Sequence, residues 1–128
     1  MTKYNNLVEE AKKLAKAKKH NDCMTSAYVG SALITDKGNV YTGISIDADC
    51  AIGFCAEHSA ISEMIKNKET KIEAIVAVSH QGKILAPCGR CRELIYQTNY
   101  NNKNTKVIMG PQKTSTLAKL LPYNWQNK

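Results

Sequence analysis

The sequence lacks any apolar run close to the about 20 residues that a membrane-spanning helix needs. Its first six residues are polar and carry no apolar core of a secretion signal. These two absences predict a cytoplasmic protein with no membrane partner. The five cysteines are an odd number, which, without a secretion signal, argues against a disulfide framework. A reducing compartment with a thiolate-bound metal fits this composition better.

The chain also lacks internal repeats, low-complexity tracts and linkers rich in Pro, Gly or Ser. Its 128 residues, 43% of them apolar, predict one globular domain over residues 1–128. The net charge is +7, and six of the eighteen Lys and Arg residues lie within the first nineteen positions. We interpret this cluster as the solvated face of a first helix rather than as a nucleic-acid surface.

Hydrophobic periodicity predicts alternating helices and strands. Leu7, Val8, Ala11 and Leu14 share one helical face, and the apolar run 72–78 is typical of a strand buried on both faces. The order of helices and strands along the chain predicts an α/β fold with one sheet covered by helices. The predicted elements are helices over 4–18, 55–67, 88–98 and 116–121, a hairpin of strands 28–35 and 40–44, strands 72–78 and 106–109, and loops over 80–83 and 98–104.

Two short segments carry candidate chemistry, Cys55-Ala56-Glu57 and Pro87-Cys88-Gly89-Arg90-Cys91, and each opens a predicted helix. Cys88 and Cys91 are three residues apart, so their thiols face the same way on the first turn. Unpaired backbone N–H groups and the helix dipole favour thiolates there. Thiolates are preferred ligands of zinc, and Cys55 supplies a third if the two helices lie side by side.

Three protein ligands leave one tetrahedral position open for water, which is the arrangement of a catalytic zinc site. Zinc lowers the pKa of bound water to about 7, and the reaction then needs a proton carrier. Glu57 lies two residues from Cys55, close enough to reach such a water without binding the metal. Three thiolates and one zinc ion sum to −1, and we expect Arg90, between the two cysteines, to offset this charge by donating to a sulfur.

A Cys or His ligand, a Glu two residues on, and a later Pro-Cys-x-x-Cys form the signature of zinc deaminases. The sequence resembles the cytidine deaminase family, including its blasticidin S deaminase branch. The resemblance covers most of the chain: residues 29–33 and 41–43 resemble the family's first strands, Cys55-Ala56-Glu57 and residues 87–92 its catalytic motifs, and residues 120–125 its closing segment.

This resemblance implies a three-layer α/β/α sandwich with one mixed sheet of about five strands. It implies one Zn²⁺ per chain, held by Cys55, Cys88 and Cys91, with Glu57 as the catalytic residue. It also implies a homotetramer with shared active sites. The expected reaction is hydrolytic deamination of a free nucleoside, from cytidine or deoxycytidine to uridine or deoxyuridine plus ammonia, as a step of pyrimidine salvage.

The same resemblance implies the substrate contacts. Ser45 and Asp47 align with an Asn and a Glu that hold the sugar hydroxyls in the family's nucleoside deaminases, and both are shorter. Ala56 and Phe54 are further expected contacts, although Phe54 equally fits a place in the core. Trp125 is expected either to cover the pyrimidine ring in a neighbouring subunit or to anchor the tail on its own domain.

Three alternatives remain open on sequence. The first is a zinc deaminase whose substrate is blasticidin S or another modified cytosine nucleoside, because Cys-Gly-Arg-Cys with its internal Arg90 resembles the blasticidin S deaminase branch. A non-catalytic module is the second, because Cys55, Cys88 and Cys91 with His58 have the spacing of a closed Cys₃His zinc site. A deaminase of nucleic-acid bases is the third, but one Trp, one Phe and six Tyr are few for its aromatic channel.

Overall fold

The computed structural model describes residues 4–128. Within them, one sheet of seven strands alternates with helices along the chain. The elements are α1 (Asn5–Leu14), β1 (Lys18–Asn21), β2 (Met24–Thr35), β3 (Val40–Ala48), the 3₁₀ turn η1 (Asp49–Ala51), α2 (Ala56–Lys66), β4 (Ile72–Ser79), β5 (Ile84–Leu85), α3 (Gly89–Thr98), the 3₁₀ turn η2 (Tyr100–Asn104), β6 (Lys106–Gly110), β7 (Lys113–Thr116) and α4 (Leu117–Leu120).

The sheet is mixed. β2 is antiparallel to its three partners β1, β3 and β4. β4 is also antiparallel to the short β5, but it runs parallel to β6, and β7 returns antiparallel beside β6. The parallel β4–β6 pair requires a crossover connection, which contains α3. This crossover brings the start of α3 beside the start of α2.

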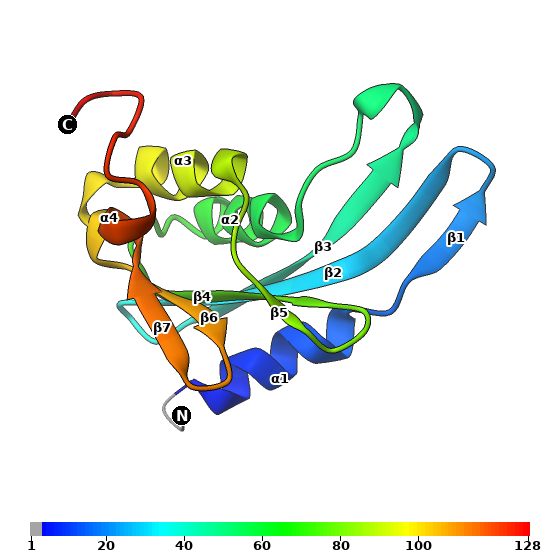
Figure 1. Cartoon of the computed structure of the whole chain (residues 1–128), viewed down its shortest axis with the longest axis horizontal. Coiled ribbons are helices and arrows are strands. Elements are labelled where there is room, and N and C mark those ends of the chain that lie inside the picture. Colours follow the sequence, from blue (N-terminus) through cyan, green and yellow to red (C-terminus); the bar gives the residue numbers. More distant parts are fainter. Residues whose placement is uncertain (1–3) are drawn as a thin grey trace.

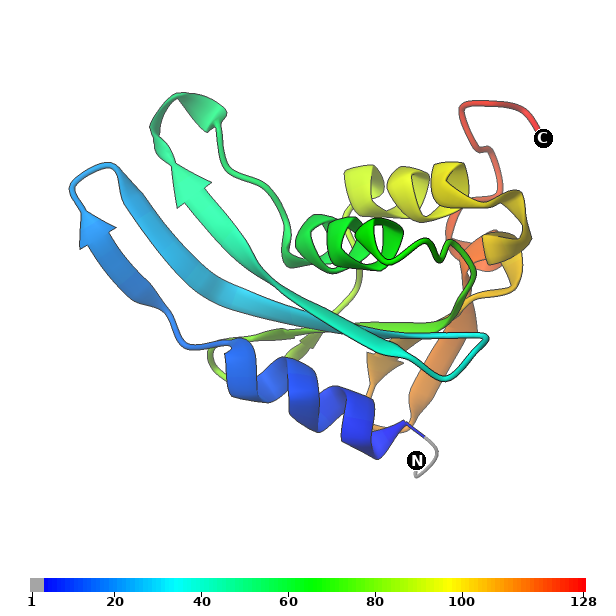
Figure 2. The same cartoon turned by 180° about the vertical axis from the view of Figure 1, so that it is seen from behind.

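Helices cover both faces of the sheet, which confirms the three-layer sandwich (Figures 1 and 2). On one face α1 buries Leu7 and Ala11 against residues such as Val76 of β4. On the other, the core contains Ile61 of α2 and Ile95 of α3. The remaining core residues from the sheet are Ala32, Ala74, Val78 and Ile108 on the α1 side, and Leu33, Ile72, Ile75 and Val107 on the opposite side. β4 is therefore buried on both faces, as its apolar run predicts.

The prediction of about five strands was too low, because three polar or very short strands have no hydrophobic pattern. β1 reads Lys-Lys-His-Asn and is fully exposed, β7 reads Lys-Thr-Ser-Thr at the sheet edge, and β5 has two residues. The first helix ends at Leu14 rather than at residue 18 because the chain turns to pair β1 with β2. The predicted loop 98–104 contains η2, in which the buried Asn102 accepts from Ile72 N–H and donates to Ile95 C=O.

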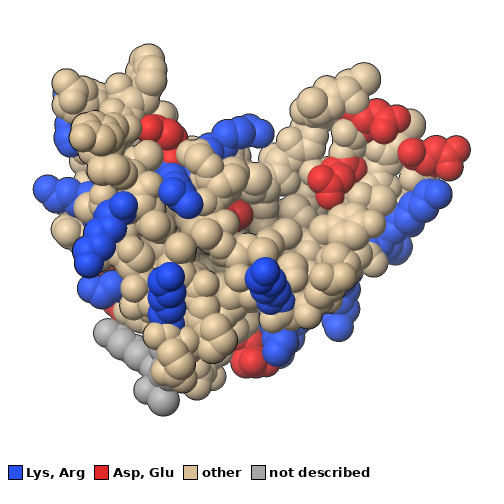
Figure 3. All heavy atoms as spheres, viewed as in Figure 1, with Lys and Arg blue, Asp and Glu red and all other residues tan. Residues whose placement is uncertain are grey.

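The strands β1, β2 and β3 extend past the helices as an arm (Figure 1). Within the arm, the pairing of β2 with β3 shifts between Ser26 and Gly30, and Ala27 has a φ of 62°. Such a bulge bends the strand and re-aims its side chains. The surface is hollowed between the arm and the helices α2 and α3 (Figure 3). Exposed carboxylates gather at the end of the arm, where Asp22, Asp47 and Asp49 lie.

Close contact between β3 and α2 depends on Gly43. A Cβ atom at Gly43 would lie 2.4 Å from Ala60 N and 2.7 Å from Ala56 O. We expect Gly43→Ala to push α2 outward and lower the free energy of unfolding by about 1–3 kcal/mol, the usual cost of overpacking. Urea unfolding measures this change. Gly110→Ala is the matched control, because its nearest neighbour would be 3.8 Å away. Equal stability of the two variants would contradict this account of the packing.

Candidate metal centre

Cys55 is placed by a short bridge between the loop before α2 and strand β3. Phe54 and Ile46 exchange two backbone hydrogen bonds, with N···O distances of 2.9 and 3.0 Å. Gly53 permits this approach, because a Cβ there would lie 2.1 Å from Ile46 O. Cys55 follows at once as the N-cap residue of α2, and its C=O accepts from His58 N–H at 3.1 Å. The predicted helix start is thus correct to within one residue.

Cys88 is the N-cap residue of α3, and Cys91 lies buried in its first turn. The loop before Cys88 is held by Arg92. Its Nε donates to Pro87 O at 2.8 Å, and its Nη1 donates to Leu120 O at 3.0 Å. Arg92 therefore ties the cysteine loop to the end of α4.

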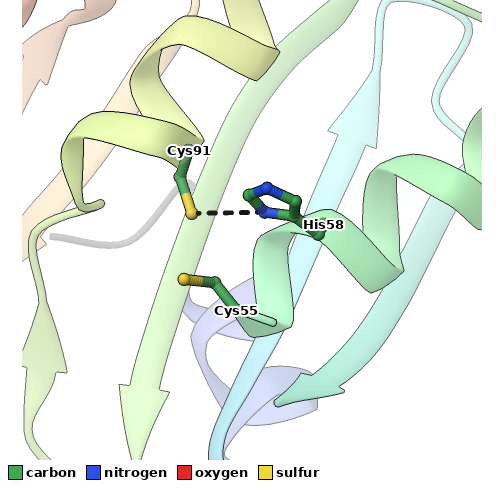
Figure 4. Close-up of side chains that lie close together, drawn as sticks. All are labelled: Cys55, His58 and Cys91. Atoms are coloured by element: carbon green, nitrogen blue, oxygen red, sulfur yellow. Dashed lines mark hydrogen bonds between the residues drawn. The ribbon is translucent and has the colours of Figure 1, made fainter. Parts of the chain in front are cut away.

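Three thiols converge where the two helices begin. Cys88 Sγ lies 3.5 Å from both Cys55 Sγ and Cys91 Sγ. His58 also faces the cluster, with its Nδ1 3.6 Å from Cys91 Sγ (Figure 4). The ligand atoms of Cys55, His58 and Cys91 all lie within 4.8 Å of one another. Residues 33 positions apart are thus brought together, as the sequence predicts.

These separations fit a zinc ion. With Zn–S bonds of about 2.3 Å, two thiolates of a tetrahedral site are about 3.8 Å apart. The observed 3.5 Å is close to this value, so little movement is needed to hold the metal. The donor set of soft thiolates with an adjacent imidazole also matches the ligands that zinc prefers.

Backbone N–H groups favour the thiolate at Cys88. Partial burial opposes ionisation, but hydrogen bonds from the N–H groups of Cys91 and Arg90 hold the pKa of the Cys88 thiol below its ordinary value. This is the effect expected for an N-cap cysteine. Burial raises the pKa of the Cys55 thiol, and burial followed by the charge of Glu57 raises the pKa of the Cys91 thiol.

Glu57 lies in the first turn of α2 and is 5% exposed. Burial raises the pKa of its carboxyl above the ordinary value, while a hydrogen bond from Cys91 acts in the opposite direction. The carboxyl therefore lies beside the thiols. A buried carboxyl with a raised pKa is suited to carry protons near neutral pH.

A cavity of about 450 Å³ opens beside Glu57, Cys55 and Cys88. It lies within the size range of small-molecule sites. The predicted contact residues Ser45, Asp47, Phe54 and Ala56 all line it. Phe54 is 37% exposed, so it does not belong to the core.

The other two predicted site residues lie differently. Arg90 is exposed and lines the cavity, but among the described residues no hydrogen bond joins its guanidinium to a thiol. Its charge acts instead on His58, whose pKa is lowered first by burial and then by Arg90. Trp125 does not line the cavity and is 84% exposed, with its backbone N–H donating to Glu93 at 2.9 Å. The indole ring is therefore largely exposed to solvent in this chain.

Sequence reasoning missed several wall residues, among them Tyr28 and Val29. Both follow the irregular pairing of β2 with β3 at Ala27, which no turn residue marks in the sequence. From its spacing, His58 is considered only as a fourth zinc ligand, and its contact with the thiol of Cys91 is not foreseen. The two remaining cysteines, Cys23 and Cys50, are exposed in turns and do not line the cavity.

A family model described as the cytidine and deoxycytidylate deaminase zinc-binding region matches residues 1–109. The chain belongs to this family. Blasticidin-S deaminase from Bacillus cereus is 34% identical over 107 residues, covering 77% of this chain and 76% of that protein. Cytidine deaminase from Mycobacterium tuberculosis is 28% identical over 95 residues, covering 73% and 69% of the two chains.

Solved structures agree. The crystal structure of cytidine deaminase from Mycobacterium leprae superposes with a TM-score of 0.79 at 26% identity, covering 96% of this chain and all of that one. The zinc that gives the family its description fits the thiol cluster of this chain. Among residues 4–128, no helix is long and apolar enough to cross a membrane.

Proposed function

We propose that this chain is a zinc-dependent hydrolytic deaminase of free cytosine nucleosides, converting cytidine or deoxycytidine to uridine or deoxyuridine and ammonia. One observation carries the proposal: the thiols of Cys55 and Cys91 each lie 3.5 Å from that of Cys88, and the buried carboxyl of Glu57 joins Cys55 and Cys88 at the wall of one cavity. Cys55, Cys88 and Cys91 would hold one Zn²⁺ per chain. Zinc, when bound, supplies a water that ionises near neutral pH.

Glu57 would move the protons. Water oxygen adds to C4 of the ring, and the carboxylate takes a proton from that water. Glu57 then passes protons to ring N3 and to the exocyclic nitrogen, so that the C4–N4 bond breaks and ammonia leaves. The buried position of Glu57 keeps its carboxyl aimed at one place.

Substrate contacts would come from the arm. Ser45 Oγ accepts from Val29 N–H at 3.1 Å, which leaves its own O–H free to donate toward a sugar oxygen. Asp47 is exposed at the cavity wall, and its carboxylate is suited to accept from sugar hydroxyls. Phe54 and Ala56 offer apolar surface to the base.

A modified cytosine nucleoside such as blasticidin S is the second candidate substrate. The relative of that name from Bacillus cereus supports it, at 34% identity. Asp47 supports it too, because a carboxylate accepts from cationic groups as readily as from hydroxyls. Nucleic acid is not proposed as a partner, because a cavity of about 450 Å³ suits a single nucleoside.

A closed Cys₃His site is the alternative of another class, and the 3.6 Å contact of His58 with Cys91 favours it. In such a site the buried Glu57 would have no role. The enzyme family to which the chain belongs and the cavity beside Glu57 support the open site instead.

We also propose a homotetramer in the cytoplasm that serves pyrimidine salvage, with Trp125 completing a neighbour's site. The exposed indole supports this arrangement, because a flat apolar ring in solvent is suited to cover a planar base in another chain. The tail lies along α3, where Tyr96 donates to Lys128 O at 2.6 Å.

Mixed oligomers test the role of Trp125. We expect Trp125→Ala to lower kcat/KM about tenfold or more, since it removes stacking and the exclusion of water, and Trp125→Phe to keep much of the activity. Chains with Glu57→Ala and chains with Trp125→Ala should regain activity when mixed, because one pairing unites an intact carboxyl with an intact tail.

Tyr123→Ala is the matched control, because Tyr123 lies in the same tail and is 93% exposed. This variant should keep its activity. No recovery in the mixture, after exchange of subunits is verified by mass, would place Trp125 outside a neighbour's site.

Ammonia release tests the proposed function itself. The zinc-loaded protein should release ammonia from at least one of cytidine, deoxycytidine, blasticidin S and N4-modified cytidines. Relative kcat/KM values then decide between the two substrate classes. Folded, zinc-loaded protein that releases ammonia from none of them would refute the proposal.

A further inference from the structure

His58 occupies a position between two cavities. On one side its Nδ1 lies 3.6 Å from Cys91 Sγ (Figure 4). On the other side the ring lines a second cavity of about 630 Å³, which Arg90 also lines. The histidine therefore lies between the thiol cluster and Arg90, the residue that we expected from the sequence to offset the charge of the thiolates.

The three sulfurs differ in the donors that support them. Cys88 receives hydrogen bonds from the backbone N–H groups of Cys91 and Arg90. Cys91 is fully buried, and its sulfur lies 3.5 Å from Cys88 Sγ and 3.6 Å from His58 Nδ1, with a further hydrogen bond to the carboxyl of Glu57. A zinc-bound thiolate carries no proton and can only accept. The imidazole of His58 is thus the side-chain nitrogen group placed to donate to the most buried sulfur.

We propose that His58 is a positioning residue that donates its Nδ1–H to the zinc-bound thiolate of Cys91, rather than a fourth ligand. The inference rests on the proposed function, because that function requires an open fourth position. With Nδ1 protonated, the opposite nitrogen is free to accept from the Arg90 side, so the positive charge of Arg90 reaches the sulfur through the imidazole. Arg90 would then act on the thiolates indirectly.

Zinc affinity, measured by competition with a chromophoric chelator, tests this role. His58→Leu removes the donor and should weaken zinc binding about 10–100-fold, the usual effect of losing a hydrogen bond to a ligand. His58→Asn places an amide N–H where Nδ1 was and should recover most of the affinity. His20→Leu is the control, since His20 is exposed in β1, and it should bind zinc like the parent chain.

Two results would overturn the proposal. His58→Leu that binds zinc as tightly as the parent chain would show that the contact has no role. His58→Cys that restores full affinity while His58→Asn does not would make position 58 a ligand. Zinc X-ray absorption of the parent chain gives a reading that needs no variant: the account predicts no imidazole scattering, and a bound imidazole would contradict it.

These readings are separate from the test of function. A chain that binds zinc as described but releases no ammonia would refute the proposed function and leave the role of His58 standing. A chain that deaminates cytidine but binds zinc equally well with leucine at position 58 would do the reverse.

Discussion

Glu57→Gln should retain one zinc per chain and a native fold while losing about 10²–10⁴-fold in kcat, the contribution of a positioned acid–base group. The amide has the shape of the carboxyl but cannot carry protons between water, ring N3 and the leaving amine. Burial of Glu57 also has a cost, since a desolvated charge is unfavourable. The neutral variant should therefore melt no lower than the parent chain.

Steady-state kinetics, zinc analysis and thermal unfolding check this prediction together. Glu63→Gln is the matched control, because Glu63 lies on the same helix and is bound to Thr42 N–H through one oxygen at 3.2 Å. It should keep its turnover. Parental rates for Glu57→Gln would exclude Glu57 as the proton carrier.

Cys91→Ala should lose zinc and much of its stability. The thiol is fully buried between two helix starts, and its loss removes one of three ligands and leaves a gap. The drop in zinc affinity should exceed the about 10–100-fold that outer-shell changes cost. Cys55→Ala and Cys88→Ala should behave alike. Because metal binding is coupled to folding, a chelator should lower the melting temperature of the parent chain as well.

Cys23→Ala and Cys50→Ala are controls within the same chain, because both thiols are exposed in turns away from the cavity. Both should keep one zinc per chain by atomic absorption. Full zinc retention in Cys55→Ala would remove Cys55 from the ligand set and, with it, the proposed centre.

The sequence predicts the parts of the fold that bury apolar side chains. The α1 face with Leu7 and Ala11 and the buried run of β4 follow from spacing alone. The strands β1 and β7 do not, because polar residues are paired there by the backbone of a neighbouring strand. Such pairing depends on tertiary contacts and leaves no periodic signal.

The candidate site divides in the same way. Convergence of Cys55, Cys88 and Cys91 is predictable, because each motif opens a helix and a metal needs several ligands in one place. The roles of the residues that surround these ligands are not predictable from the sequence. His58 reads in sequence as a ligand by its spacing, and only the position of its ring between Cys91 and the cavity lined by Arg90 indicates a donor.

Deamination in ¹⁸O-labelled water tests the central claim most directly. Zinc-loaded protein acting on its best cytosine nucleoside should give a product that carries one water-derived oxygen at C4, with one ammonia per product, and Glu57→Gln protein should form both about 10²–10⁴-fold more slowly. Product without the label, or folded zinc-loaded protein that releases no ammonia from any cytosine nucleoside, would contradict the account.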